Sequence, residues 1–429
     1  MDHIPFLTAW DPRQSLKGSR DPLGAMALWT HQGRRVIGNL TTVSTQVRDF
    51  TVTLLGYYLV GRQRELEGPG REAEVFLKWE QLAAYVRAHV LEEGGFRGVE
   101  RTRNHLSTRG PKVTLSTRSE HLILGDQKVY GLMGTYTMPA RSSGLLEGDP
   151  IRLTPAALRM VETGCLPRLQ GVAGKHLDGL ARRLAGGEVK VELDGRDEKL
   201  ALALGGMLKR RILSSERPFY QKYLLFNAEN DTTEGRQQVL AAHLLSEPVQ
   251  DWNMAALRHL ARTLKGSGEP GRSLAHYLER IAVMESVLGP VGMLFGFLQT
   301  RSGQTLSSVV EEVTRVWGPG LRYLDPNAFE ELKPSIAEVD PDGPDRWSQL
   351  ALALREGRFG DTVKLVLDQN RAVMQRRGAA AWIDVKAGRL DVRYKDATNA
   401  LDSPEHLVSR LRHPYFMSSL QGMANQLKA

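Results

Sequence analysis

The sequence predicts a mainly helical protein with a smaller β content, an α+β fold divided into several domains. The chain has 429 residues, about three times the usual length of one domain. Its content of 41% hydrophobic and 25% charged residues is ordinary for a globular protein that buries a core. Apolar residues also recur at helical spacing along most of the chain. Together these observations favour a folded, multi-domain, helix-rich protein.

The first 150 residues predict a mixed α/β domain. Apolar side chains recur at spacings of three and four over residues 43–57, which indicates a helix. Residues 75–93 indicate a second helix with one apolar stripe, which the paired glycines Gly94 and Gly95 end. Residues 121–136, punctuated by glycines, favour strands and turns. The polar residues that we expect outside the apolar stripe of the second helix are Lys78, Glu80, Gln81 and Arg87.

Two turn-rich segments predict the remaining domain boundaries. Residues 138–150 are dense in glycine, serine and proline, and Thr154 with Pro155 then has the pattern of a helix start. A helical domain is therefore expected over residues 151–338. The acidic, proline-rich and glycine-rich residues 339–345 mark the second boundary.

The last domain, residues 346–429, predicts two helices followed by a β-hairpin. The helices are expected near residues 346–356 and 361–377. Apolar and polar residues then alternate over 383–385 and 390–394 around a Lys-Ala-Gly turn. The order helix, helix, hairpin is typical of a winged-helix-like module, in which a helix enters the major groove and the hairpin lies along the DNA backbone.

Composition restricts the compartment and the class of protein. Cys165 is the only cysteine, so an intrachain disulfide and a cysteine-based zinc site are excluded, and a buried structural thiol is favoured. Residues 1–20 lack the pattern of a secretory signal, which together with the cysteine count favours a cytoplasmic protein. The most apolar run, residues 287–298, is too short to span a bilayer and predicts a buried helix, so no membrane partner is expected.

Catalytic and cofactor motifs are not recognisable, so we expect no cofactor and lean away from an enzyme. Phosphate-loop, dinucleotide-binding and serine-hydrolase glycine patterns are missing. The weak catalytic candidates are Asp384 and Lys386, an Asp-x-Lys pattern on the expected hairpin with Asp361 and Asp368 upstream. Metal-dependent nucleases use such carboxylates to hold magnesium. Solvated residues on the outer face of a hairpin explain the same pattern.

Positive charge points to a nucleic-acid partner. The formal net charge is +8, and arginine supplies most of the cations. The segment 96–118 has a single acid and interleaves its cations with Ser, Thr and Asn, side chains that contact phosphate oxygens. A solvated surface is the alternative. The predicted nucleic-acid-binding residues are Arg97, Arg101, Arg103, Arg109, Lys112 and Arg118, with Lys386, Arg389 and Arg393 of the hairpin.

Four N-terminal motifs carry a resemblance to a group of bacterial proteins. These are Asp21-Pro-Leu-Gly24, residues 39–44 (Asn-Leu-Thr-Thr-Val-Ser), Arg48-Asp-Phe50, and Gly134-Thr-Tyr-Thr-Met-Pro-Ala-Arg-Ser-Ser-Gly-Leu145. Over about the first 150 residues the chain resembles poorly characterised bacterial proteins encoded near phage-defence and DNA-processing systems. The resemblance implies a component of a multi-protein bacterial defence complex that works on DNA or with a DNA-handling partner, and it implies no catalytic residues.

The leading hypothesis is therefore a non-catalytic, DNA-associated subunit that contacts double-stranded DNA without sequence preference and works with other protein subunits. One alternative is a helical scaffold or adaptor, in which apolar segments such as residues 274–298 face a partner or the core. The other alternative is a metal-dependent nuclease that uses Asp384 and Lys386.

Overall fold

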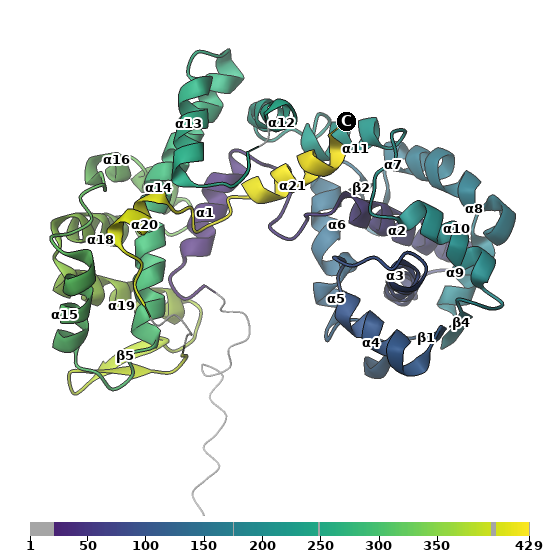
Figure 1. The fold of residues 1–429 in the computed structure, drawn as a ribbon, viewed down its shortest axis with the longest axis horizontal. Coiled ribbons are helices and arrows are strands. Elements are labelled where there is room, and N and C mark those ends of the chain that lie inside the picture. The colour runs from purple at the N-terminus through teal and green to yellow at the C-terminus, as the bar shows by residue number, and fades with distance from the viewer. Residues whose placement is uncertain (1–20, 175, 248, 396–399, 429) are drawn as a thin grey trace, which may run out of the picture. The chain divides into compact units, whose positions relative to one another are not determined.

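The computed structural model describes residues 21–174, 176–247, 249–395 and 400–428. Residues 1–20, on which the prediction about a secretory signal rests, lie outside the described residues. The chain divides into two compact units, each assembled from separate stretches (Figure 1). Unit 1 comprises the residues up to Val36 and Val249–Tyr415, and unit 2 comprises Ile37–Pro248 and the residues from Phe416 onward.

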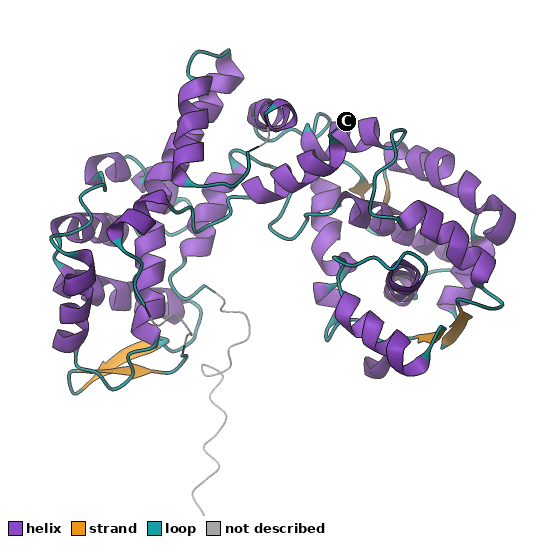
Figure 2. Cartoon of the chain, in the orientation of Figure 1, coloured by secondary structure: helices purple, strands orange, loops and turns teal. Residues whose placement is uncertain are grey.

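The prediction of a mainly helical fold with a small β content is confirmed (Figure 2). Helices account for 62% of the residues and strands for 5%. The described strands form three two-stranded antiparallel sheets, β1 with β4, β2 with β3, and β5 with β6. Such small sheets cannot hold a core alone, so helix packing supplies the core of both units.

Unit 1 is built around one long helix, α14, which contacts α1, α13, α16, α18, α19 and α20. The elements of unit 1 are α1 (Ala25–Arg34), α13 (Met254–Leu264), α14 (Glu269–Gln299), α15 (Leu306–Trp317), α16 (Pro326–Glu330), α17 (Lys333–Ala337), α18 (Pro344–Glu356), α19 (Phe359–Arg376), β5 (Ile383–Lys386), β6 (Arg389–Val392) and α20 (Pro404–Ser409).

Helix α14 is long and apolar enough, by length and composition, to cross a membrane. In the structure 83% of its most apolar window is buried inside the protein, which is the pattern of a core helix. The predicted buried helix at residues 287–298 is the C-terminal part of α14. Most of residues 274–298, which the adaptor alternative assigned to the core or to a partner surface, pack in the core.

The two helices and the hairpin predicted near the C-terminus are confirmed as α18, α19 and β5–β6. The hairpin turns at Ala387 and Gly388, whose φ angles of 49° and 71° are typical of a tight two-residue turn. The loop before α15 extends the hairpin, because Gly303 N–H donates to the Leu390 carbonyl and Leu390 N–H donates to the Gln304 carbonyl. The winged-helix-like character of this region stays a prediction.

Unit 2 is built around α2 and α3, and Figure 1 shows α3 end-on among its neighbours. Its elements are α2 (Val47–Glu67), α3 (Glu72–His89), α4 (Val99–Arg109), β1 (Lys112–Leu115), the 3₁₀ turn η2 (Ser119–His121), α5 (Gln127–Tyr130), α6 (Leu132–Ser142), β2 (Leu146–Glu147), β3 (Arg152–Leu153), α7 (Pro155–Met160), the π turn η3 (Val161–Cys165), α8 (Leu166–Ala173), α9 (Asp178–Ala185), β4 (Val189–Glu192), α10 (Glu198–Leu208), α11 (Arg217–Tyr220), the π turn η4 (Gln221–Leu225), α12 (Arg236–Ser246) and α21 (Met417–Leu427).

The predicted domain boundaries at residue 150 and at residues 339–345 do not coincide with the limits of the two units. Strand β1 pairs with β4, and this pairing joins residues on both sides of the expected boundary at 150. Residues 339–343 lie in the turn between α17 and α18 within unit 1, and residues 344–345 begin α18; Asp340 of the turn accepts a hydrogen bond from Arg376 of α19. Turn-rich composition marked connections inside the units because local turn chemistry does not report long-range packing.

The predicted strands at residues 121–136 are wrong, since this segment forms η2, α5 and the start of α6. Its glycines permit close packing between helices. A Cβ atom at Gly131 would lie 2.6 Å from a Glu80 carboxylate oxygen, and one at Gly134 would lie 2.0 Å from the Val129 carbonyl oxygen. These glycines were interpreted as strand punctuation because one sequence cannot distinguish turn glycines from close-contact glycines.

The expectation that the polar residues of α3 lie outside its buried stripe is also wrong, because α3 packs against other elements on all sides. Lys78, Glu80, Gln81 and Arg87 are all buried. Each has polar partners: Lys78 donates to the Leu184 carbonyl at the end of α9, and the Gln81 side chain pairs with the backbone of Ser116. Hydrogen bonds offset the cost of removing Lys78, Glu80 and Gln81 from water, while Arg87 forms ion pairs with Asp49 and Glu93.

Glu80 makes the stability of the protein sensitive to pH. Its carboxylate, 3% exposed, accepts hydrogen bonds from the Leu132 N–H and the Gln127 side chain, yet burial raises its pKa to about 7. Between its ordinary pKa and about 7 the folded protein holds a proton that the unfolded chain releases. The free energy of unfolding should therefore fall as pH rises through this window, by about 3 kcal/mol.

Urea denaturation at intervals from pH 5 to pH 8 measures the slope of the free energy of unfolding against pH. Glu80→Gln should flatten it, because the amide does not titrate, whatever the variant does to stability at one pH. Burial also raises the pKa of Asp49, so part of the slope should remain. An unchanged slope in Glu80→Gln would show that Glu80 is not its source.

Candidate functional site

The basic segment predicted to bind nucleic acid forms α4, β1 and the turns that flank them. Helix α4 begins after Gly98, whose φ of 78° and close approach to the Ile123 carbonyl leave no room for a side chain. Thr102 is the only fully buried residue of α4. The remaining residues, among them Arg101, Arg103 and Arg109, are exposed or half-buried. A helix this polar gains most of its stability from the elements beneath it and leaves its cations in water.

The three arginines of α4 divide between two sides of the helix. Arg101 donates to the Leu122 carbonyl at 3.3 Å, and Arg109 lies 3.4 Å from the ring of His121, so both reach the same turn. Arg103 extends the other way and donates to the Glu93 carbonyl at 3.4 Å. Residues two apart on a helix do not face each other, which explains the split. Among the described residues no carboxylate forms an ion pair with any of these three guanidinium groups.

The other predicted cations of this segment have protein partners. Lys112 lies 3.7 Å from Glu192, and Arg118 lies 2.6 Å from Glu188, across the β1–β4 sheet. Arg97 donates to the Tyr130 carbonyl at 3.1 Å. The Lys112 and Arg118 side chains are 75% and 67% exposed, so their ion pairs contribute about 0–1 kcal/mol and can exchange for a phosphate at small cost.

The three cations predicted on the hairpin differ in whether their charged groups have partners within the protein. Lys386 pairs with Asp391, and Arg389 donates to the Gly303 carbonyl at 2.8 Å. Arg393 is exposed, and no ion pair of Arg393 occurs within the part of the chain that the structure describes. Arg393 is therefore the hairpin residue that an external anion can reach most readily.

The weak catalytic candidate Asp384 lies opposite Asp391 in the β5–β6 register. Arg371 contacts Asp384 at 3.5 Å and Asp368 at 2.7 Å, while Asp361 pairs with Arg358 near the start of α19. The described residues contain no group of three His, Cys, Asp or Glu side chains that could hold a metal ion. The structure thus does not bring the proposed acids together, and the nuclease alternative stays a prediction without geometric support.

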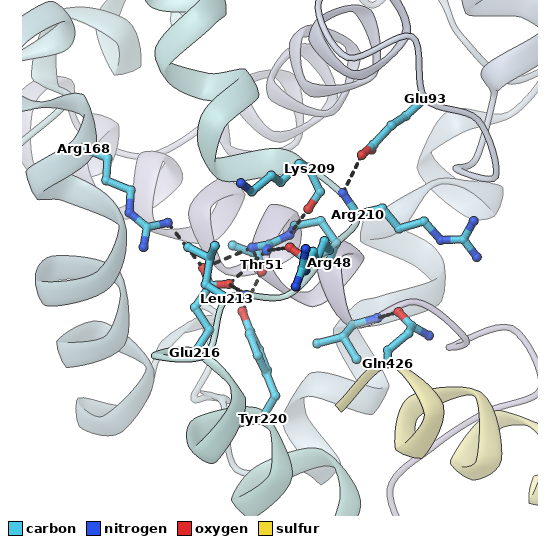
Figure 3. A network of polar contacts seen from close by, with 12 residues as sticks. Arg48, Thr51, Glu93, Arg168, Lys209, Arg210, Leu213, Glu216, Tyr220 and Gln426 are labelled. Atoms are coloured by element: carbon cyan, nitrogen blue, oxygen red, sulfur yellow. Dashed lines mark hydrogen bonds and ion pairs between the residues drawn. The ribbon is translucent and has the colours of Figure 1, made fainter. Parts of the chain in front are cut away.

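A buried ionic network in unit 2 was not predicted from the sequence (Figure 3). The Arg48 side chain is fully buried and donates to both carboxylate oxygens of Glu216, at 2.9 and 3.2 Å. It also donates to Thr51 and to the carbonyl oxygens of Lys209 and Arg211. Every donor direction of the guanidinium is occupied, so this network holds α2 against the segment between α10 and α11.

Glu216 of this network borders an open pocket of about 630 Å³, which we name the Glu216 pocket. Arg168 lies on its wall, 3.7 Å from Glu216 (Figure 3). The residues that line the pocket are Ala156, Arg159, Met160, Thr163, Gly164, Pro167, Arg168, Ser215, Glu216, Pro218, Phe219, Lys222 and Tyr223. The volume lies within the range of small-molecule sites, so this pocket is a second candidate site.

Cys165, next to the pocket wall, is buried as the sequence predicted. Burial raises the pKa of its thiol to about 12, which keeps it protonated and unreactive at neutral pH. Arg48, Glu216 and Arg168 come from distant parts of the chain, and of the three only Arg48 belongs to one of the N-terminal motifs, Arg48-Asp-Phe50. Comparisons with protein-family models, with curated proteins and with solved structures gave no match for this chain.

Proposed function

We propose that the protein is a non-catalytic, nucleic-acid-associated subunit of a bacterial multi-protein system, acting in phage defence in the cytoplasm. The observation that carries this proposal is the set of exposed α4 arginines, Arg101, Arg103 and Arg109, that have no carboxylate partner among the described residues. A guanidinium fork suits phosphate oxygens, and the like charges of Arg101 and Arg109, which reach the same turn, repel each other unless an anion is near. The role in defence rests on the resemblance of the N-terminal 150 residues.

The contact is with phosphates and carries no sequence information. Arg101 and Arg109, which reach the turn at residues 121–122, form the centre of the interface, and Arg118, directly before η2, adds a cation. Hydrogen bonds to phosphate oxygens fix a protein on a duplex without reading bases. We propose that α18, α19 and the hairpin add a winged-helix-like contact through Arg393, supported by the added strand-like edge at residues 303–304.

Reversing the charge at Arg101 and Arg109 to glutamate should weaken binding to a 30-base-pair duplex by at least about tenfold and lower the slope of log K against log salt by about two. Fluorescence anisotropy at several salt concentrations measures both quantities. The matched control reverses Arg262 and Arg315, exposed arginines of α13 and α15, and produces the same change in net charge.

Binding that falls equally in the two double variants would reflect net charge alone and would contradict an interface on α4. Wild-type protein that fails to bind duplex DNA, single-stranded DNA and RNA at low salt would contradict the whole proposal. Arg393→Glu, measured in the same way, reports whether the hairpin contributes.

A further inference from the structure

The Glu216 pocket carries more positive charge than its single acid can balance. Arg159, Arg168 and Lys222 lie on its walls, whereas Glu216 is the one carboxylate that lines it. Arg48 already neutralises Glu216 from the buried side through two hydrogen bonds. Lys222 pairs with Glu229 outside the lining, and Arg159 has no ion pair among the described residues. The pocket therefore presents a net positive field to any molecule that enters it.

Apolar and aromatic side chains make up much of the rest of the lining. Phe219 and Tyr223 lie with ring centroids 4.8 Å apart, and Met160, Pro167 and Pro218 extend this surface. A planar ring of a ligand can stack on such aromatic and apolar side chains. One pocket thus combines guanidinium groups suited to phosphate with a surface suited to a base.

Both π-helical turns that the structure describes border this pocket. Thr163 and Gly164 come from η3, and Lys222 and Tyr223 come from η4. A π turn is rare and is frequently found at functional sites. In η3 the wide turn precedes Pro167, which has no N–H to donate to the preceding turn of helix. Because of these two turns, the walls of the pocket deviate from regular α-helical geometry.

From these observations we propose that the Glu216 pocket binds a nucleoside phosphate, with the phosphate held by Arg159, Arg168 and Lys222 and the base placed against Phe219. The site differs from the proposed nucleic-acid interface in its residues, its concave shape and the size of its ligand. The proposal assigns Arg159, Arg168, Lys222 and Phe219 roles in binding, and it includes no catalytic step.

Isothermal titration of the full chain with the four common ribonucleoside monophosphates and triphosphates tests the proposal. At least one should bind saturably with one site per chain. The corresponding nucleoside and inorganic phosphate should each bind at least about tenfold more weakly, because each makes only half of the contacts. No saturable binding by any of the eight nucleotides, or equal binding of nucleoside and nucleotide, would overturn it.

Two variants place the ligand in the pocket. Arg159→Ala removes a cation that forms no ion pair within the described residues, so it should weaken nucleotide binding at least about tenfold without loss of stability. Gly164→Leu should block the pocket, since a Cβ atom there meets no heavy atom within 4 Å and the added chain points into open space. Its matched control is Gly206→Leu in α10, where a Cβ atom also meets nothing within 4 Å.

Wild-type affinity in both Arg159→Ala and Gly164→Leu would show that the nucleotide binds elsewhere. The double variant at Arg101 and Arg109 should keep its nucleotide affinity, which separates this proposal from the nucleic-acid interface. If Arg159→Ala instead weakened duplex binding as strongly as that double variant, the pocket would belong to the polynucleotide interface and the small-ligand proposal would be wrong.

Discussion

Replacing Glu216 with alanine should lower the free energy of unfolding by about 3–5 kcal/mol, because the variant leaves the Arg48 guanidinium buried without its counter-charge. Arg48 is 0% exposed and Glu216 4% exposed, so water cannot replace the lost carboxylate without opening the structure. Urea denaturation followed by far-UV circular dichroism measures the loss. Glu216→Gln, which keeps an acceptor but loses the charge, should fall between alanine and wild type.

An exposed ion pair provides the control for this experiment. Glu147 lies 3.2 Å from Arg152, with both side chains largely in water, so Glu147→Ala should cost less than about 1 kcal/mol. The double variant Arg48→Met with Glu216→Leu should recover stability relative to Glu216→Ala, because the fully buried charge of Arg48 is removed together with its partner. A Glu216→Ala variant as stable as Glu147→Ala would contradict the role we assign to the buried pair.

Glu285→Ala should destabilise unit 1 by about 3 kcal/mol or more, since one buried carboxylate serves four donors. Glu285 of α14 is 1% exposed and accepts from the backbone N–H groups of Arg412 and His413, from the His413 ring and from the Tyr415 hydroxyl. Alanine leaves all four donors without a partner. Denaturation gives the loss, and hydrogen–deuterium exchange of residues 412–413 should accelerate before global unfolding.

Glu279 of the same helix is the matched control, because its exposed ion pair with Lys265 lies at 2.7 Å in water. Glu279→Ala should change stability by less than about 1 kcal/mol and leave exchange at residues 412–413 unaltered. Slow exchange at these residues in Glu285→Ala would mean that other contacts hold the segment.

Local patterns in the sequence predicted many of the elements correctly. Thr154 caps α7 with Pro155 in its first turn, and the two helices and hairpin near the C-terminus lie within a few residues of their expected positions. These features depend on interactions between residues close in sequence, such as capping, helical periodicity and turn conformation. The cations of α4 were predicted from the charge of the segment alone, and the helix that carries three of them was not predicted.

Partners that come from distant segments could not be predicted in the same way. Arg48 and Glu216 are separated by 168 positions, and no spacing rule connects them. The acids that pair with Lys112 and Arg118 lie in β4 and directly before it, and the pairing of β4 with β1 has no local signal. Buried polar residues such as Glu80 were expected in water because a charged side chain usually lies there. The Glu216 pocket arises from such long-range packing.

The division of the chain into units has a consequence for synthesis on the ribosome. Helix α21 packs on α12 and η4 of unit 2, yet it is translated after the whole second stretch of unit 1. Folding of unit 2 therefore cannot be completed until that stretch has been synthesised. Until α21 is made, the apolar surface of unit 2 that it covers is exposed and stays open to aggregation.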